Sequence, residues 1–287
     1  MPLMPGIVHL HLYMRVHLRE KRDQIPVPRC PAWRNKAAFA DIIGVSPADY
    51  RKRAKASGKR KMTGELIIAD RVLVWFMSNE RSDREVNMII KQLAIGYMDN
   101  FSYIVGCAKT RKALVIDPGA EVEQILSAAQ DEKLTIETIV NTHGHSDHTA
   151  GNGSLKAATG ARIIIHSRDA DAYPAADLFL NDESKLQAGE LIFDVFHTPG
   201  HTPGGICLYA RGNLFTGDTL FVGDSGRTDL PGGHRPTLGA SIRRLMQLPD
   251  ETVVWPGHNY GPMPSSTIGW EKRHNVNARE YGYYVAD

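Results

Sequence analysis

The sequence predicts an α/β fold in its C-terminal two-thirds, with β-sheets covered by helices. Short apolar runs alternate with segments of helical periodicity after residue 88. The runs follow one another both directly, as meanders, and across helical segments, a mixture typical of sheets packed against helices. Apolar residues make up 42% of the 287 positions and charged residues 23%, the usual balance of a globular protein with a core.

The predicted elements begin with three strands over residues 88–116, which meander to a turn at Asp117-Pro118-Gly119. The elements expected next are a helix with an apolar stripe at Val122, Ile125, Leu126 and Ala129, a strand at 137–142, a helix near 148–158, and strands at 161–166 and 189–197. The last elements expected are a hairpin turning at Arg211-Gly212-Asn213, a helix striped by Leu238, Ile242, Leu245 and Met246, and a strand at 251–255.

The charge is distributed unevenly along the chain. Residues 1–90 contain 17 Lys/Arg and 9 Asp/Glu, a net charge of +8, whereas residues 91–287 contain 17 and 23, a net charge of −6. We therefore predict a basic N-terminal extension, 1–87, of unknown role and a separate domain, 88–287. Seven of the eleven positions in 51–61 are basic, a pattern that can contact phosphates but more often marks a solvated surface. Residues 64–76 are expected to form a strand or a strand pair.

The cysteines and the hydropathy pattern bear on the cellular location of the protein. Cys30, Cys107 and Cys207 are far apart and odd in number, so they cannot form a disulfide framework, and we expect a reducing, cytoplasmic location. No stretch approaches the roughly 18 uninterrupted apolar residues of a membrane span. Residues 1–22 also lack the pattern of a signal peptide, so no membrane partner is predicted.

The strongest chemical signal is NTHGHSDH, residues 141–148, where an apolar strand ends and a helix begins. Alternate residues at a strand end point to the same side, so His143 and His145 can face one metal ion. Asp147 and His148, where the backbone enters the helix, can face a second. Further candidate ligands follow apolar runs beside Gly or Pro: His201, Asp218 and His258. His166 and His197 have no motif partner and are expected to pack or to support ligands.

This ordered set of ligands resembles the HxHxDH motif and the later His, Asp and His of the metallo-β-lactamase fold superfamily, over about residues 88–275. The resemblance implies an αββα sandwich, in which two sheets pack face to face between helices. It also implies a first metal ion on His143, His145 and His201, a second on Asp147, His148 and His258, and Asp218 bridging both. Such donors suit two divalent ions, zinc or alternatively iron or manganese, roughly 3.5–4 Å apart.

Two ions sharing one water would lower its pKa to about 7, and Asp147 would orient the metal-bound hydroxide. Such a nucleophile suits a thioester, because the departing thiolate has a conjugate pKa of about 8.5 whereas an amide nitrogen must be protonated as it leaves. This chemistry alone does not exclude lactams as substrates.

Further segments resemble the glyoxalase II-like group, which hydrolyses hydroxyacylglutathione thioesters: 99–105, 116–119, 226–233, 256–262 and 265–275. This resemblance implies a small-molecule thioester as the partner, with glutathione as the candidate thiol. It places Arg227 against the anionic glutathione, and Lys272 and Arg273 are further candidates. Where the group has an aromatic residue two positions beyond the basic one, this chain has Asp229.

Two alternatives remain open from the sequence. The first is a persulfide dioxygenase, a relative with the same motifs, which would hold one iron on His143, His201 and Asp218. The second is a nucleic-acid-binding regulator that contacts phosphates through 51–61 and keeps the metal domain as a scaffold. Oligomeric state is not predicted.

Overall fold

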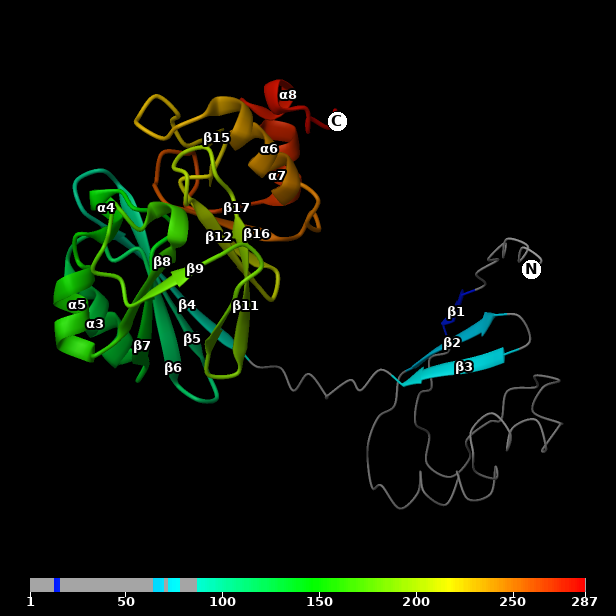
Figure 1. The fold of residues 1–287 in the computed structure, drawn as a ribbon, viewed down its shortest axis with the longest axis horizontal. Coiled ribbons are helices and arrows are strands. Elements are labelled where there is room, and N and C mark those ends of the chain that lie inside the picture. Colours follow the sequence, from blue (N-terminus) through cyan, green and yellow to red (C-terminus); the bar gives the residue numbers. More distant parts are fainter. Residues whose placement is uncertain (1–12, 16–63, 70–71, 78–86, 287) are drawn as a thin grey trace, which may run out of the picture. The chain divides into compact units, whose positions relative to one another are not determined.

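The computed structural model describes residues 13–15, 64–69, 72–77 and 87–286 (Figure 1). The chain divides into two compact units, Met1–Glu85 and Val86–Asp287. In the first unit, β1 (Tyr13–Arg15), β2 (Gly64–Ala69) and β3 (Val72–Met77) form an antiparallel sheet in that order, so the strand pair expected at 64–76 is present. Cys30 and the basic run 51–61 lie outside the described residues, and a nucleic-acid partner stays a prediction.

The second unit begins with a six-stranded sheet. Its strands, in spatial and chain order, are β4 (Met88–Ile95), β5 (Asn100–Cys107), β6 (Lys112–Ile116), β7 (Thr135–Val140), β8 (Arg162–His166) and β9 (Leu178–Leu180). The first three pair antiparallel, which confirms the predicted meander, and the last four pair parallel. Parallel neighbours need crossovers. Helix α3 (Val122–Asp131), the helices α4 (Ser146–Thr149) and α5 (Asn152–Thr159), and the short 3₁₀ helix η2 (Ser167–Asp169) lie in these crossovers.

A second six-stranded sheet follows. Its order is β10 (Lys185–Ala188), β11 (Leu191–His197), β12 (Ile206–Ala210), β13 (Asn213–Gly217), β16 (Val253–Pro256) and β17 (Ser266–Thr267). All neighbours are antiparallel except β13 and β16, between which α6 (Arg235–Leu245) crosses over. The remaining elements are the hairpin β14 (Leu220–Phe221) and β15 (Asp224–Ser225), and the helices α7 (Ile268–His274) and α8 (Ala278–Tyr281).

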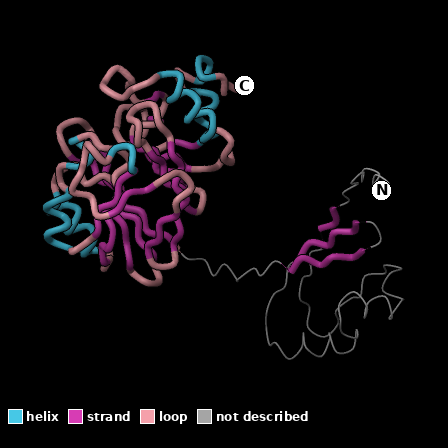
Figure 2. The backbone as a smooth tube through the Cα atoms, viewed as in Figure 1, coloured by secondary structure: helices cyan, strands magenta, loops and turns pink. Residues whose placement is uncertain are grey.

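Three apolar clusters define four layers. One joins the facing sides of the two sheets and includes Val105, Leu114, Phe193 and Phe215. A second packs the first sheet against α3 and α5, and a third packs the second sheet against α6, α7 and α8. Figure 2 shows the helices outside the two groups of strands. The predicted αββα sandwich is therefore confirmed.

One polar contact crosses between the sheets near their shared end. Tyr103 of β5 is 2% exposed and donates its hydroxyl hydrogen to the Pro256 carbonyl of β16 at 2.6 Å. Its ring lies edge-on to Phe215 at 5.2 Å between centroids. Burial of one such side chain contributes about 1.5–3 kcal/mol. The contact fixes the end of β16, and the functional histidine His258 lies two residues beyond it.

The structure describes two of the three cysteines, and its helices can be compared with the length that a membrane span requires. Cys107 and Cys207 are both free and buried. Within the part of the chain that the structure describes, no helix is both long and apolar enough to cross a membrane.

Candidate metal centre

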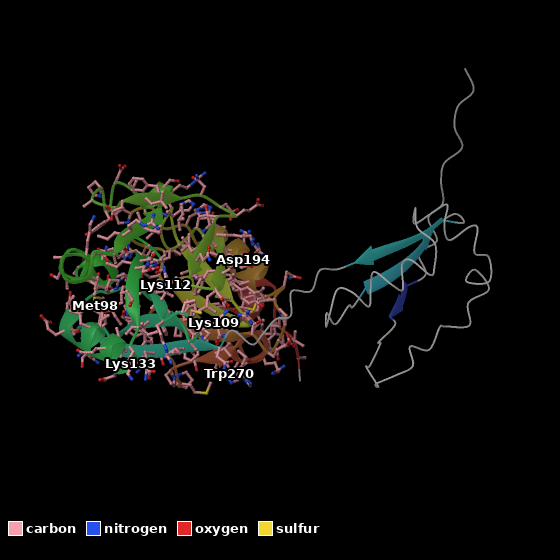
Figure 3. The ribbon with its side chains drawn as sticks, turned by 90° about the horizontal axis from the view of Figure 1, so that it is seen from below. Met98, Lys109, Lys112, Lys133, Asp194 and Trp270 are labelled. Carbon is pink, nitrogen blue, oxygen red and sulfur yellow. The ribbon has the colours of Figure 1, made fainter. Side chains whose placement is uncertain are left out.

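The histidines and carboxylates predicted as metal ligands gather where strands of both sheets end. His143 follows β7, Asp218 follows β13 directly, and His258 follows β16. An isolated bridge between Asn100 and His258 joins the two sheets at this end. The opposite strand ends, seen from below in Figure 3, carry lysines such as Lys109 and Lys112, which form ion pairs with Glu190 and Glu137.

The first group consists of His143, His145 and His201, whose ligand atoms all lie within 4.8 Å of one another. Nδ1 of His145 is 3.0 Å from Nε2 of His143 and 3.0 Å from Nε2 of His201. His143 and His201 are buried, whereas His145 is half-buried. Three ring nitrogens therefore converge on one point, as a metal site requires.

The second group consists of Asp147, His148 and His258, again within 4.8 Å. Nε2 of His148 is 3.1 Å from Nε2 of His258 and 3.3 Å from Oδ2 of Asp147. Oδ2 of Asp147 also accepts a hydrogen bond from Nδ2 of Asn100 at 2.9 Å. Asp147 is 17% exposed, while both histidines are buried. The carboxylate of this group is thus its accessible member.

Asp218 lies between the two groups. Its Oδ2 is 3.4 Å from Nε2 of His201 in the first group and 3.3 Å from Nε2 of His258 in the second. The side chain is 8% exposed, and its buried Oδ1 makes no hydrogen bond among the described residues, although Nε2 of His148 lies 3.4 Å away. A buried carboxylate oxygen without a hydrogen bond is costly in water-free surroundings, and a cation would satisfy it.

In each histidine ring, the hydrogen bond of the nitrogen that points away from the cluster shows which nitrogen can bind a metal ion. His148 donates from Nδ1 to Asp117 Oδ2 at 3.0 Å, His201 donates from Nδ1 to the Arg227 carbonyl at 2.7 Å, and His258 donates from Nδ1 to the Met98 carbonyl at 2.8 Å. Because carbonyl and carboxylate oxygens only accept, each Nδ1 carries a hydrogen, and each Nε2 faces inward as the candidate ligand atom.

His143 and His145 complete this pattern in opposite ways. Thr142 donates its hydroxyl hydrogen to Asp117 at 2.6 Å, so its oxygen accepts from Nδ1 of His143 at 3.1 Å. His143 therefore also offers Nε2. His145 alone turns Nδ1 inward, toward both of its partners. The five rings thus turn one nitrogen each toward the two groups, Nδ1 in His145 and Nε2 in the other four.

Burial and neighbouring charges act in opposite directions within this cluster. Burial and the nearby His148 hold the pKa of His143 well below its usual range. Burial also lowers the pKa of His148, but the carboxylates of Asp218 and Asp117 outweigh it and raise that pKa well above the usual range. Burial raises the pKa of Asp218, but the charge of His148 and a hydrogen bond from His258 bring it far below the normal value. Asp218 is therefore ionised, and a metal ion at this position would replace the His148 proton that faces it.

Asp117 is a site residue that the sequence placed in a turn and in a family-like segment, 116–119, but not among the functional side chains. It is 2% exposed and accepts hydrogen bonds from the Thr142 backbone N at 2.7 Å, the Thr142 hydroxyl and His148. Its oxygens also lie within 4.8 Å of ring nitrogens of His143 and His148. Because these donors already occupy both oxygens, we assign Asp117 to orienting His148 rather than to binding a metal. The available signal was a carboxylate directly after the buried strand β6.

The three basic residues predicted to bind substrate lie in different places. Arg227 is next to the cluster through its carbonyl, and its guanidinium donates two hydrogen bonds of 2.6 Å to Asp229. These hydrogen bonds lower the pKa of the Asp229 carboxyl to about 2. Lys272 donates to Asp250 at 2.6 Å, before β16, whereas His258 follows the other end of that strand. Arg273 is exposed on α7. Only Arg227 is thus in contact with a ligand of the metal centre.

A family model described as the metallo-beta-lactamase superfamily matches residues 96–258, a span that contains all seven predicted ligands. The chain belongs to this superfamily. An uncharacterized protein of Aquifex aeolicus is 37% identical over 213 residues, which are 67% of this chain and 98% of that protein. A hydroxyacylglutathione hydrolase of Rhodospirillum rubrum is 40% identical over 173 residues, or 60% of this chain and 66% of the relative.

Solved structures of superfamily members agree with the fold. ETHE1 from Myxococcus xanthus is 34% identical, with a TM-score of 0.64 over 69% of this chain and 88% of that one. TTHA1623, solved in a di-iron-bound form, is 33% identical, with a TM-score of 0.57 over 65% of this chain and 98% of that one. The chain is therefore an enzyme of the metallo-beta-lactamase superfamily, which includes metallo-hydrolases and binds divalent metal ions.

Proposed function

We propose that this superfamily member hydrolyses thioesters of the hydroxyacylglutathione type with two divalent metal ions. The observation that carries the proposal is the buried Asp218 between two three-residue groups: its carboxylate oxygens lie 3.3–3.4 Å from ring nitrogens of both groups. His143, His145 and His201 would hold one ion, Asp147, His148 and His258 the other, and Asp218 both. Imidazoles with carboxylates suit zinc, iron or manganese. The name of the Rhodospirillum rubrum relative supports the substrate class.

The chemistry divides between the ions and the side chains. Bound divalent ions lower the pKa of a water toward about 7 and polarise a carbonyl. Asp147 contributes a carboxylate that Asn100 holds in place and that is open to solvent on one side. The Asp147 carboxylate can accept a hydrogen bond from the attacking water and orient it toward the thioester carbon. The buried rings of His143, His148 and His201 keep bulk water from the rest of the centre.

The function is tested by measuring metal content together with two activities. Purified protein is analysed for zinc, iron and manganese, then assayed with S-lactoylglutathione and with glutathione persulfide. We expect about two metal equivalents and release of glutathione from the thioester. One iron equivalent, with oxygen consumption on the persulfide and no thioester cleavage, would contradict the proposal.

That second outcome would establish the alternative, a mononuclear-iron persulfide dioxygenase, which the similarity to ETHE1 favours. Its iron would sit on His143, His201 and Asp218, a two-histidine, one-carboxylate face. Oδ2 of Asp218 lies 3.4 Å from Nε2 of His201, so the geometry is compatible with this arrangement. A mononuclear dioxygenase would not need the three ligands of the second group, Asp147, His148 and His258.

The ion pair between Arg227 and Asp229 gives a prediction about the thiol part of the substrate. Both side chains are more than half exposed, so solvent screens their pairing and it adds little to the stability of the fold. Asp229 nevertheless competes with any substrate carboxylate for the guanidinium. Asp229→Asn should therefore lower KM for S-lactoylglutathione by about 2- to 5-fold. Steady-state kinetics should show kcat unchanged.

Asp250→Asn is the matched control, because it removes the carboxylate partner of Lys272 at a distance from the centre. An uncharged thioester serves as the second control, and its KM should not respond to Asp229→Asn. A KM for S-lactoylglutathione that stays the same or rises in Asp229→Asn would remove Arg227 from the substrate site.

A further inference from the structure

Asp169, at the end of η2, connects the two loops that supply the first metal group. It is 5% exposed. Its Oδ2 accepts hydrogen bonds from the Gly144 backbone N at 3.0 Å and the Thr202 hydroxyl at 2.8 Å, and its Oδ1 accepts one from the Gly204 backbone N at 2.6 Å. Gly144 lies between His143 and His145, while Thr202 follows His201 directly. One carboxylate thus links the HGH loop, 143–145, to the turn after His201, 202–204.

Both loops approach the Asp169 segment as closely as backbone can. A Cβ atom placed on Gly204 would lie 2.5 Å from Cγ of Asp169, and one on Gly144 would lie 2.4 Å from Cβ of Ala172. Real Cβ atoms do not come this near to other heavy atoms, so glycine is needed at both positions. The two loops therefore pack tightly against the Asp169 segment in addition to their hydrogen bonds, and this packing limits their movement away from it.

A stacked histidine pair supports the same turn from another side. The ring of His166 on β8 lies 4.1 Å from that of His197 at an interplanar angle of 10°. Nε2 of His197 is 2.9 Å from the Pro203 carbonyl, which can only accept, so the ring donates the hydrogen bond. This agrees with the supporting role expected for both histidines. Pro203 is the residue between the two partners of Asp169 in this turn.

The charge of Asp169 is essential to its three contacts. Within the described residues, Asp169 forms no ion pair, so its charge is stabilised by backbone N–H groups and a hydroxyl. An asparagine in its place would have one accepting oxygen and one NH₂ group. The NH₂ group would then face at least one backbone N–H, and one of the two loops would lose its hydrogen bond.

We infer that Asp169 is a positioning residue that holds His143, His145 and His201 in a metal-binding arrangement before the ion arrives. Supporting residues of this kind typically change metal affinity by about 10- to 100-fold. The first group should be affected more than the second, because Asp169 holds residues next to the first group's ligands in both loops, whereas it reaches the second group only through the chain from Gly144 into α4. The inference rests on the proposed metal-binding function.

The test is a zinc titration of metal-free protein against a chromophoric chelator, combined with its thermal unfolding midpoint. For Asp169→Asn we expect one of the two zinc equivalents to bind about 10- to 100-fold more weakly and the other to be weakened less. Thr202→Val removes one hydrogen bond only and should weaken the same equivalent to a smaller degree. Asp177→Asn is the matched control, because Asp177 accepts from the Ile163 backbone N at 2.8 Å without contacting either histidine loop.

Three results would contradict either the role of Asp169 or the proposed function. If Asp169→Asn and Thr202→Val lower the unfolding midpoint but bind both zinc equivalents like the wild type, Asp169 is merely structural and the inference fails. Equal weakening of both equivalents also overturns it. If the wild-type protein itself binds no zinc, iron or manganese, the proposed function fails instead, and the titration distinguishes the two failures.

Discussion

Asp218→Asn should reduce the metal content of the purified protein from about two equivalents to one or fewer and lower thioester turnover on the order of 10³-fold. Asp218 contacts both groups, with Oδ2 at 3.4 Å from His201 and 3.3 Å from His258. Asparagine has nearly the same shape but no charge, so it cannot neutralise two cations. The loss of charge, rather than a change in packing, is therefore the expected cause.

Elemental analysis and initial rates with S-lactoylglutathione measure the two effects. Asp194→Asn is the control, because Asp194 is an exposed carboxylate on β11 that pairs with Lys185 outside the centre. It should keep both metal equivalents and full turnover. Two equivalents of metal and near wild-type turnover in Asp218→Asn would show that the Asp218 carboxylate does not mark a metal site.

The candidate ligands could be located from the sequence because their signal is local. His143 and His145 are two positions apart at the end of a buried strand, and this spacing alone places them on one side. Their ring nitrogens do converge in the structure. The sequence could not show that His145 turns Nδ1 inward whereas His143 turns Nε2 inward. That choice depends on the outer partner of each ring, here Thr142 behind His143.

The supporting carboxylates could not be predicted because their contacts are distant in sequence. Asp117 holds His148, 31 positions away, and Asp169 holds Gly204, 35 positions away. Neither residue stands in a periodic pattern or a spaced motif with its partner. Their role arises only when neighbouring strands bring the loops together, which local propensity does not encode.

The elements that were predicted differ from the structure mainly at their boundaries, whereas the short strands β9, β10, β14, β15 and β17 and the helices α7 and α8 were not predicted. The helix expected near 148–158 is two helices, α4 and α5. Asn141 donates to the His148 carbonyl at 3.0 Å and also contacts Asn152 at the start of α5. These side-chain hydrogen bonds replace backbone ones at the junction and separate the ligand-bearing turn from the longer helix.

Asp147→Asn should leave the first group able to bind its ion while lowering kcat on the order of 10²- to 10⁴-fold. Asp147 belongs to the second group only, and it is the carboxylate of the centre with the greater exposure, 17% against 8% for Asp218. An amide oxygen can still face a metal, but it accepts a hydrogen bond from water far more weakly than a carboxylate does. The loss should therefore appear in kcat rather than in KM or in the metal content of the first group.

Asn100→Ala keeps the Asp147 carboxylate and removes the amide that holds it at 2.9 Å; because the same amide nitrogen lies 3.4 Å from Nε2 of His148, metal content is measured alongside kcat. If Asp147 acts by orienting the attacking water, Asn100→Ala should lower kcat to an intermediate value with both metal equivalents retained. Ser146→Ala, at the exposed residue beside Asp147, is the control and should change neither quantity. A fully active Asp147→Asn would exclude the orienting role, whereas loss of activity in step with loss of the second metal would reduce Asp147 to a ligand.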